Sequence, residues 1–173
     1  MRLLVTRPEP DADRTARALR DRGRQALVAP LIHVEPIPDA PIGEGPWAAI
    51  ALTSANAVTA LVAHPAKARL LRVPVFTVGA RTEEAAHAAA FAHVESAYGD
   101  VAALASLIVA RLADRTKQVL YLAGEDRAGN LEALLGEYGI AVHTVPIYRA
   151  VQATRLSEAA RSALANDRID GVL

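Results

Sequence analysis

The sequence has no cysteine, few aromatic residues and no excess of charge of either sign. The lack of cysteine excludes disulfide bonds, thiolate catalysis and iron–sulfur ligation by this chain. Aromatic residues make up 4% of the sequence, too few for a stacking platform for single-stranded nucleic acid. The 19 basic residues equal the 19 acidic residues and form no cluster, so we expect no nucleic-acid partner.

The sequence also lacks a long hydrophobic run. No apolar segment approaches the roughly 20 residues that a membrane-spanning helix needs. The apolar part of the N-terminus is too short for a signal peptide, so we expect a cytoplasmic protein with no membrane partner. The chain of 173 residues, 52% hydrophobic and 22% charged, can bury the core of one domain or of two small ones.

The clearest pattern that is present predicts a β-α-β unit. An apolar run over Val119–Ala123 is typical of a buried parallel strand. Asn130 can cap a following helix, and Gly139 stands where the left-handed residue after a helix belongs. A second strand is expected over Ile140–Val145. The inward positions of the helix are spaced at i, i+3, i+4 and i+7, and they are Leu131, Leu134, Leu135 and Tyr138.

The start of the chain has the same order of elements. Gly23 and Pro30 precede Gly139 and Pro146 by the same offset, and each proline is followed by an extended apolar segment. Any two β-α-β units align about this well, so common ancestry stays open. The many prolines between residues 30 and 46 predict an extended connector and a domain boundary.

Strands alternate with helices through the rest of the chain, which predicts an α/β fold with parallel sheets. Further strands are expected over Trp47–Thr53, Pro74–Val78, His93–Ala97 and Ile169–Leu173. A short helix is expected after Asn56, with Val58, Leu61 and Val62 inward, and it should end near Pro65. Further helices are expected after Thr82 to about Ala90, after a cap at Asp100, and over Leu156–Ala165.

The turns that follow the strands carry small hydroxyl or amide residues. They are Thr6-Arg7, Thr53-Ser54-Ala55-Asn56, Gly79 to Thr82 and Gly124 to Asn130. In a parallel sheet such turns share the carboxyl edge, where free backbone N–H groups favour anionic ligands. Three turns in one sheet therefore favour a polyanion site. The alternative interpretation is that Ser54, Thr82 and Asn130 are only helix N-caps, and that Tyr148 is only a packed aromatic residue.

None of the stronger catalytic motifs is present. The sequence contains no GxGxxG, Walker lysine loop, GxSxG or HExxH pattern. Its five histidines have no ligand spacing, so we expect no metal site and interpret them as structural or exposed.

The order of these segments resembles the uroporphyrinogen-III synthase family. The segments that carry the resemblance are LLVTRPEPDADRTARAL, APLIHVEPI, AIALTSANAVTAL, PVFTVGARTEEAA, VLYLAGEDRAGNLEALLGEYGIAV and PIYRAV. Each motif is loose, but their order and spacing cover essentially the whole chain. One departure is Ala90, where the family commonly has glycine.

The resemblance implies two parallel-sheet α/β lobes joined by two extended connectors. Residues 1–35 plus 149–173 would form a discontinuous first lobe, and residues 36–148 would form the inserted second lobe. Because the family continues past IDGVL, we expect the first lobe to be incomplete and the 173-residue chain to have little or no synthase activity.

The resemblance also implies a cofactor-free, monomeric lyase of the hydro-lyase type in porphyrin and heme biosynthesis. Its substrate would be hydroxymethylbilane, closed to uroporphyrinogen III with inversion of the last pyrrole ring. Tyr148 would assist departure of the substrate hydroxyl, and the substrate-binding residues would be Thr6, Arg7, Ser54, Ala55, Asn56, Thr82 and Gly124. The alternative from another class is a non-catalytic two-lobed binding protein for a small polyanion.

Overall fold

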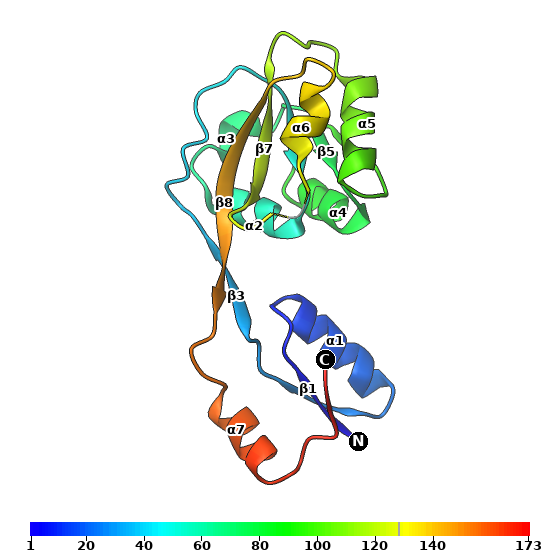
Figure 1. Ribbon diagram of the computed structural model, residues 1–173, viewed down its shortest axis with the longest axis vertical. Helices are drawn as coiled ribbons and strands as arrows, with labels where there is room; N and C mark the ends of the chain where they lie inside the picture. The colour runs from blue at the N-terminus through cyan, green and yellow to red at the C-terminus, as the bar shows by residue number, and fades with distance from the viewer. Residues whose placement is uncertain (128) are drawn as a thin grey trace. The chain divides into compact units, whose positions relative to one another are not determined.

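The computed structural model describes residues 1–127 and 129–173 (Figure 1). Their contacts divide the chain into two compact units. Unit 1 consists of Met1–Glu35 with Ala150–Leu173, and unit 2 of Pro36–Arg149. In the part of the chain that the structure describes, no helix is long and apolar enough to cross a membrane.

Unit 1 is a small parallel sheet with two helices. Its elements are β1 (Arg2–Val5), α1 (Asp11–Asp21), β2 (Gln25–Val28), α7 (Glu158–Ala165) and β9 (Gly171–Val172). The central strand β1 is parallel to both β2 and β9. Ser157 caps α7, because its hydroxyl oxygen accepts from the Ala160 N–H. The buried cluster of this unit contains Leu4, Ala29 and Ala160.

Unit 2 contains most of a six-stranded sheet in the order β3-β8-β7-β4-β5-β6. The strands from β8 to β6 pair in parallel. The strands β3 (Ile32–Pro36) and β8 (Val142–Gln152) pass between the two units along the chain. The remaining elements are β4 (Trp47–Leu52), α2 (Ala55–Ala63), α3 (Lys67–Leu70), β5 (Val75–Thr77), α4 (Ala80–Ala88), β6 (Val94–Ser96), α5 (Val101–Arg111), β7 (Gln118–Gly124) and α6 (Leu131–Gly136).

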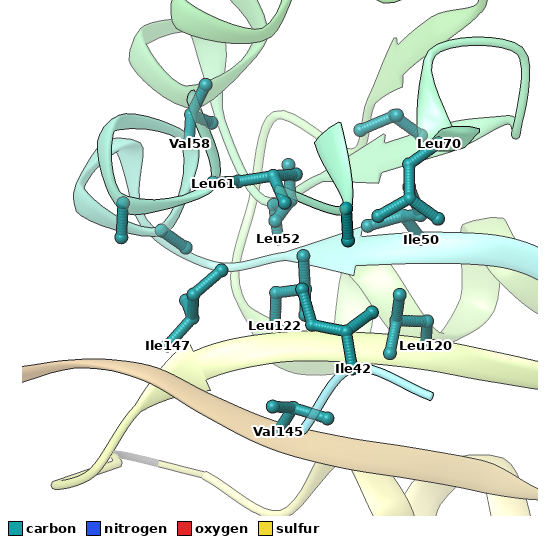
Figure 2. Packing of buried hydrophobic residues seen from close by; sticks show 14 of the residues in the cluster. Ile42, Ile50, Leu52, Val58, Leu61, Leu70, Leu120, Leu122, Val145 and Ile147 are labelled. Carbon is teal, nitrogen blue, oxygen red and sulfur yellow. The ribbon is translucent and has the colours of Figure 1, made fainter. Parts of the chain in front are cut away.

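The central strands bury large side chains on one face of this sheet. Because successive strand residues point to opposite faces, Leu52 of β4 and Leu122 of β7 fall on the same side, with no exposed surface. They pack against Val58 and Leu61 of α2, as Figure 2 shows. Helices α3 and α4 contribute to the same cluster.

The opposite face carries smaller side chains. Ala49, Ala51 and Ala123 lie there among buried residues of α5 and α6. Small residues let the helices approach the sheet closely. Two large aromatic residues lie among them, Phe76 of β5 and Tyr121 of β7, and Tyr121 is only 2% exposed. The chain therefore places one long polar-tipped side chain among alanines on a central strand.

Four helices end in the same backbone arrangement. The residue in the left-handed conformation donates its N–H three residues back, and the next N–H reaches five residues back, as in a Schellman motif. The left-handed residues are Gly23, Ala90, Gly139 and Asp167, with φ of 70°, 68°, 70° and 50°. Ala90 therefore occupies a position that glycine adopts at lower cost.

The expected α/β architecture is confirmed, as are the side-chain caps at Asn130 and Asp100. The prediction that Val62 points inward is wrong, because it is 47% exposed beside the buried Leu61. Tyr138 is also exposed, at 56%, because α6 ends at Gly136 before the fourth inward position. The strand expected from Ile140 begins at Val142 and continues to Gln152. The short helix α3 was not expected from the sequence.

Candidate active site

A pocket of about 320 Å³ lies at the carboxyl ends of the unit 2 strands. Both the turn after β4 and the end of β7 contribute to it, as expected for ligand sites in parallel sheets. Its lining residues all belong to unit 2, and they are Thr53, Ser54, Val78, Asp100, Val101, Tyr121, Gly124, Asp126, Arg127 and Tyr148. The sequence-predicted residues Ser54, Gly124 and Tyr148 are therefore brought together.

Tyr148 lies against the backbone of Gly124. The two residues are partners in the β7–β8 register, and the Glu125 N–H donates to the Tyr148 carbonyl oxygen at 2.9 Å. A Cβ atom on Gly124 would lie 2.9 Å from Cζ and 3.0 Å from Oη of Tyr148. Only glycine leaves room for the ring in this position, so Gly124 determines where the Tyr148 hydroxyl lies.

The Tyr148 side chain is half-buried and packs at the margin of the cluster that contains Leu52 and Leu122. Its hydroxyl has no hydrogen-bond partner among residues 1–127 and 129–173. The side chain thus combines the packing of a core aromatic residue with a hydroxyl that is free to bind a ligand.

A second tyrosine reaches the same pocket from the other face of the sheet. The Tyr121 hydroxyl lies 3.1 Å from the Thr53 hydroxyl, and either can donate. Burial is the main cause that raises the pKa of Tyr121, although the hydrogen bond to Thr53 opposes the shift. The phenol is therefore neutral at physiological pH. Tyr121 does not stand out in the sequence, because it lies inside an apolar strand pattern.

The charged groups beside the pocket are mostly acidic. Asp100 and Asp126 line it, and Arg127 is paired with Glu132, whose carboxylate lies 3.0 Å from the guanidinium. The Thr144 hydroxyl donates to the same carboxylate at 2.7 Å. Burial alone would raise the pKa of Glu132, but the Thr144 hydrogen bond, a backbone hydrogen bond and the Arg127 charge together lower it.

A broader hollow of about 490 Å³ adjoins these residues, lined by Glu125, Asp126, Arg127, Gly129, Asn130 and Glu132. In the described part of the chain, no group of three or more histidine, aspartate or glutamate side chains could hold a metal ion. The neutral donors of this region are hydroxyl groups and backbone N–H groups, so they are the groups that can bind an oxygen-bearing ligand.

A family model described as Uroporphyrinogen-III synthase HemD matches residues 13–173 of the chain. The chain belongs to the uroporphyrinogen-III synthase family. A search of curated proteins gave no significant match.

Solved structures of uroporphyrinogen-III synthases have the same fold. The enzyme from Helicobacter pylori is 22% identical, with a TM-score of 0.61 over 95% of this chain and 68% of that chain. A mutant of the enzyme from the extreme thermophile Thermus thermophilus is 16% identical, with a TM-score of 0.55 over 99% of this chain and 71% of that chain. At these identities the likeness concerns the fold alone.

Ala55, Asn56 and Thr82, which were also expected in a synthase site, are not among the residues that line the pocket. The Ser54 hydroxyl oxygen accepts from the Asn56 N–H at 3.1 Å and caps α2, so Ala55 and Asn56 form the first turn of that helix. Thr82 is 4% exposed within α4, whose N-cap is Gly79, so the alternative interpretation of Thr82 as a helix N-cap is wrong.

Two expected residues belong to unit 1. The backbone N–H and the hydroxyl of Thr6 both donate to the Leu173 carbonyl oxygen, at 2.7 and 2.9 Å. Arg7 follows it and is exposed. Thr6 therefore ends β1 by binding the backbone after β9, while the Arg7 guanidinium is accessible to solvent.

Proposed function

We propose that this protein closes linear hydroxymethylbilane to uroporphyrinogen III and inverts the last pyrrole ring. The observation that carries the proposal is the match of the synthase family model across residues 13–173. The pocket in unit 2 supports it, because it gathers hydroxyl donors at the carboxyl edge of a parallel sheet.

The reaction begins with departure of the substrate's terminal hydroxyl. The C–O bond breaks, and the oxygen leaves with an added proton as water. The pyrrole nitrogen supplies an electron pair and loses its proton, which leaves a neutral, electrophilic azafulvene. A substituted carbon of the last ring attacks this centre and forms a spiro intermediate, which rearranges to the inverted macrocycle. The substrate is intrinsically reactive, so the protein's main task is to orient the ends and to exclude simple closure.

Tyr148 is the residue that we assign to the departing hydroxyl. Tyr148 lines the pocket, and its hydroxyl has no partner in the described part of the chain, so it can donate to the leaving oxygen. Gly124 supports this role, since its missing side chain lets the ring lie where it does.

The carboxylates of the substrate require other partners. We assign them to the start of α2, to the backbone N–H groups of Ser54 and Ala55 and to the side-chain amide of Asn56, because a helix N-terminus favours anions. The Asn56 N–H itself already donates to the Ser54 hydroxyl oxygen. Thr6 and Arg7 are the proposed binding residues of unit 1, and the exposed Arg7 guanidinium can pair with a carboxylate.

The proposal is tested with the protein at the full length that its gene encodes. It is mixed with freshly generated hydroxymethylbilane, and the type I and type III products are separated after oxidation to porphyrins. We expect type III in excess over the type I isomer that forms without enzyme. Type I alone, at the rate of a protein-free control, would contradict the proposal. Tight binding of the bilane without closure would instead indicate a polyanion-binding protein.

A further inference from the structure

We propose that the hydroxyl pair formed by Thr53 and Tyr121 is a second donor to the oxygen that leaves the substrate, acting beside Tyr148. The inference rests on the proposed function and concerns the same pocket. It extends the site to a side chain that comes from the α5–α6 face of the sheet.

The Thr53–Tyr121 pair has one more O–H proton than its internal hydrogen bond uses. Two hydroxyl groups carry two protons, and the hydrogen bond of 3.1 Å between them uses one. The other O–H has no acceptor among the residues that the structure describes. Whichever hydroxyl donates within the pair, one donor is left over in a pocket wall. Because buried donors are normally satisfied, this one is suited to an acceptor on a ligand.

Tyr121 has little freedom to turn elsewhere. Tyr121 is 2% exposed and packs among alanines and the helices α5 and α6, so its ring has little room to move. A donor held in this way loses little conformational freedom when it binds substrate. Burial also keeps the phenol protonated and therefore able to donate.

The charges around the pocket identify the acceptor. Asp100 and Asp126 line it, and the one arginine of its lining is paired with Glu132. A substrate carboxylate would meet two like charges here, whereas the neutral hydroxymethyl oxygen would not. The same two aspartates would stabilise the positive charge that develops on the pyrrole as the oxygen departs. The hydroxymethyl end therefore suits this pocket better than the carboxylate arms do.

The pair makes a specific prediction about single and double variants. In Tyr121→Phe, the Thr53 hydroxyl keeps its proton and can still donate, so we expect kcat to fall only about 3- to 10-fold. Thr53→Val leaves the Tyr121 hydroxyl and should behave similarly. The double variant removes both donors, and we expect a fall in kcat of about 10- to 100-fold with KM changed less than about 3-fold. Thr53→Ser retains a hydroxyl, so this variant should keep most of the kcat that Thr53→Val loses.

Two control variants lie outside the pocket. Tyr98→Phe removes the hydroxyl of a 71% exposed tyrosine that donates to Glu83, and Thr59→Val removes an exposed hydroxyl that donates to the Ala55 carbonyl oxygen. Both should leave kcat unchanged. Trp47 fluorescence during urea unfolding verifies that each variant is folded.

The assay is steady-state kinetics of the full-length protein on hydroxymethylbilane, with isomer analysis of the product. Retention of the wild-type kcat by the double variant, with only a lowered unfolding midpoint, would overturn the inference and leave the proposed function in place. Failure of the wild-type protein to form type III product would overturn both.

Discussion

Unit 2 contains every aromatic residue of the chain, and unit 1 contains none. Unit 2 also buries side chains on both faces of its sheet, in two extensive clusters. The buried cluster of unit 1 has three members, of which two are alanines. Hydrophobic stabilisation grows with the apolar area removed from water, so unit 2 has much the stronger core.

The two units differ in charge as well. Unit 1 carries ten basic and eight acidic residues, whereas unit 2 carries nine basic and eleven acidic residues. The acidic excess of unit 2 includes Asp100 and Asp126 in the pocket wall. This charge distribution supports our proposal that the pocket of unit 2 holds the neutral hydroxymethyl end of the substrate.

The largest effect is expected from a core substitution in unit 2. Leu122 is fully buried on the central strand β7, so Leu122→Ala should cost about 2–5 kcal/mol of unfolding free energy. The single tryptophan, Trp47, stacks on His143 at 5.2 Å and reports on unit 2 alone. Its fluorescence in urea should therefore show the loss.

The matched substitution in unit 1 is Leu4→Ala, at a position that is 3% exposed. It should lower the stability seen by far-ultraviolet circular dichroism and leave the Trp47 transition in place. An equal shift of the Trp47 transition by Leu4→Ala would show that the two units unfold together, and would contradict a separate core in each unit.

The next effect concerns the contact between Gly124 and Tyr148. In Gly124→Ala the new Cβ would lie 2.9 Å from the ring, which must move, so we expect a loss of about 1–3 kcal/mol. The control is Gly136→Ala at the end of α6, where nothing lies within 4 Å and alanine should stabilise by a few tenths to about 1 kcal/mol. If Gly124→Ala has the wild-type unfolding free energy in urea, the Tyr148 ring is not held against Gly124.

Two substitutions at helix ends should have smaller effects on stability, and these effects should be opposite in sign. Ala90 has a left-handed φ of 68° at the end of α4, so Ala90→Gly should stabilise unit 2 by about 1 kcal/mol. Gly139 has the same geometry after α6, with nothing within 4 Å, and Gly139→Ala should cost a similar amount. Calorimetric melting of both variants tests the pair. A lower Tm for Ala90→Gly would contradict backbone strain at Ala90.

The smallest effect depends on pH. The pKa of Glu132 is lower in the folded protein than its ordinary value of 4.5. The ionised Glu132 side chain therefore adds to the unfolding free energy at pH values above 4.5. This contribution is lost as pH falls through the lower, folded-state pKa. Because the carboxylate is partly exposed, we expect about 0.2–1 kcal/mol. Glu132→Gln should flatten this part of the acid profile of the Trp47 transition, and an unchanged profile would contradict the assignment.

Much of the fold could be predicted from local patterns. The run Val119–Ala123, the cap at Asn130 and the glycine at position 139 each act within a few residues, and each is found as expected. Periodicity failed where a helix stopped early, as at Tyr138. A spacing rule contains no information on where a helix ends.

The candidate site was predicted less completely for a different reason. Ser54, Gly124 and Tyr148 come from turns and a connector, where polar and glycine residues stand out in the sequence. Tyr121 looks like any core residue of a buried strand, and its contact with Thr53 joins β7 to the turn after β4 across 68 residues of sequence. Contacts of that kind depend on strand order and side-chain length, which no local pattern contains.

Tyr148→Phe in the full-length protein distinguishes a tyrosine that serves the reaction from one that serves only the core. Turnover and urea unfolding are measured on the same preparation. Because the ring's packing is kept and the hydroxyl lacks a partner in the described chain, we predict an unfolding free energy within about 0.5 kcal/mol of the wild type. We predict that turnover falls roughly ten- to a thousandfold. Normal turnover with a stability loss of about 1–2 kcal/mol would contradict the account.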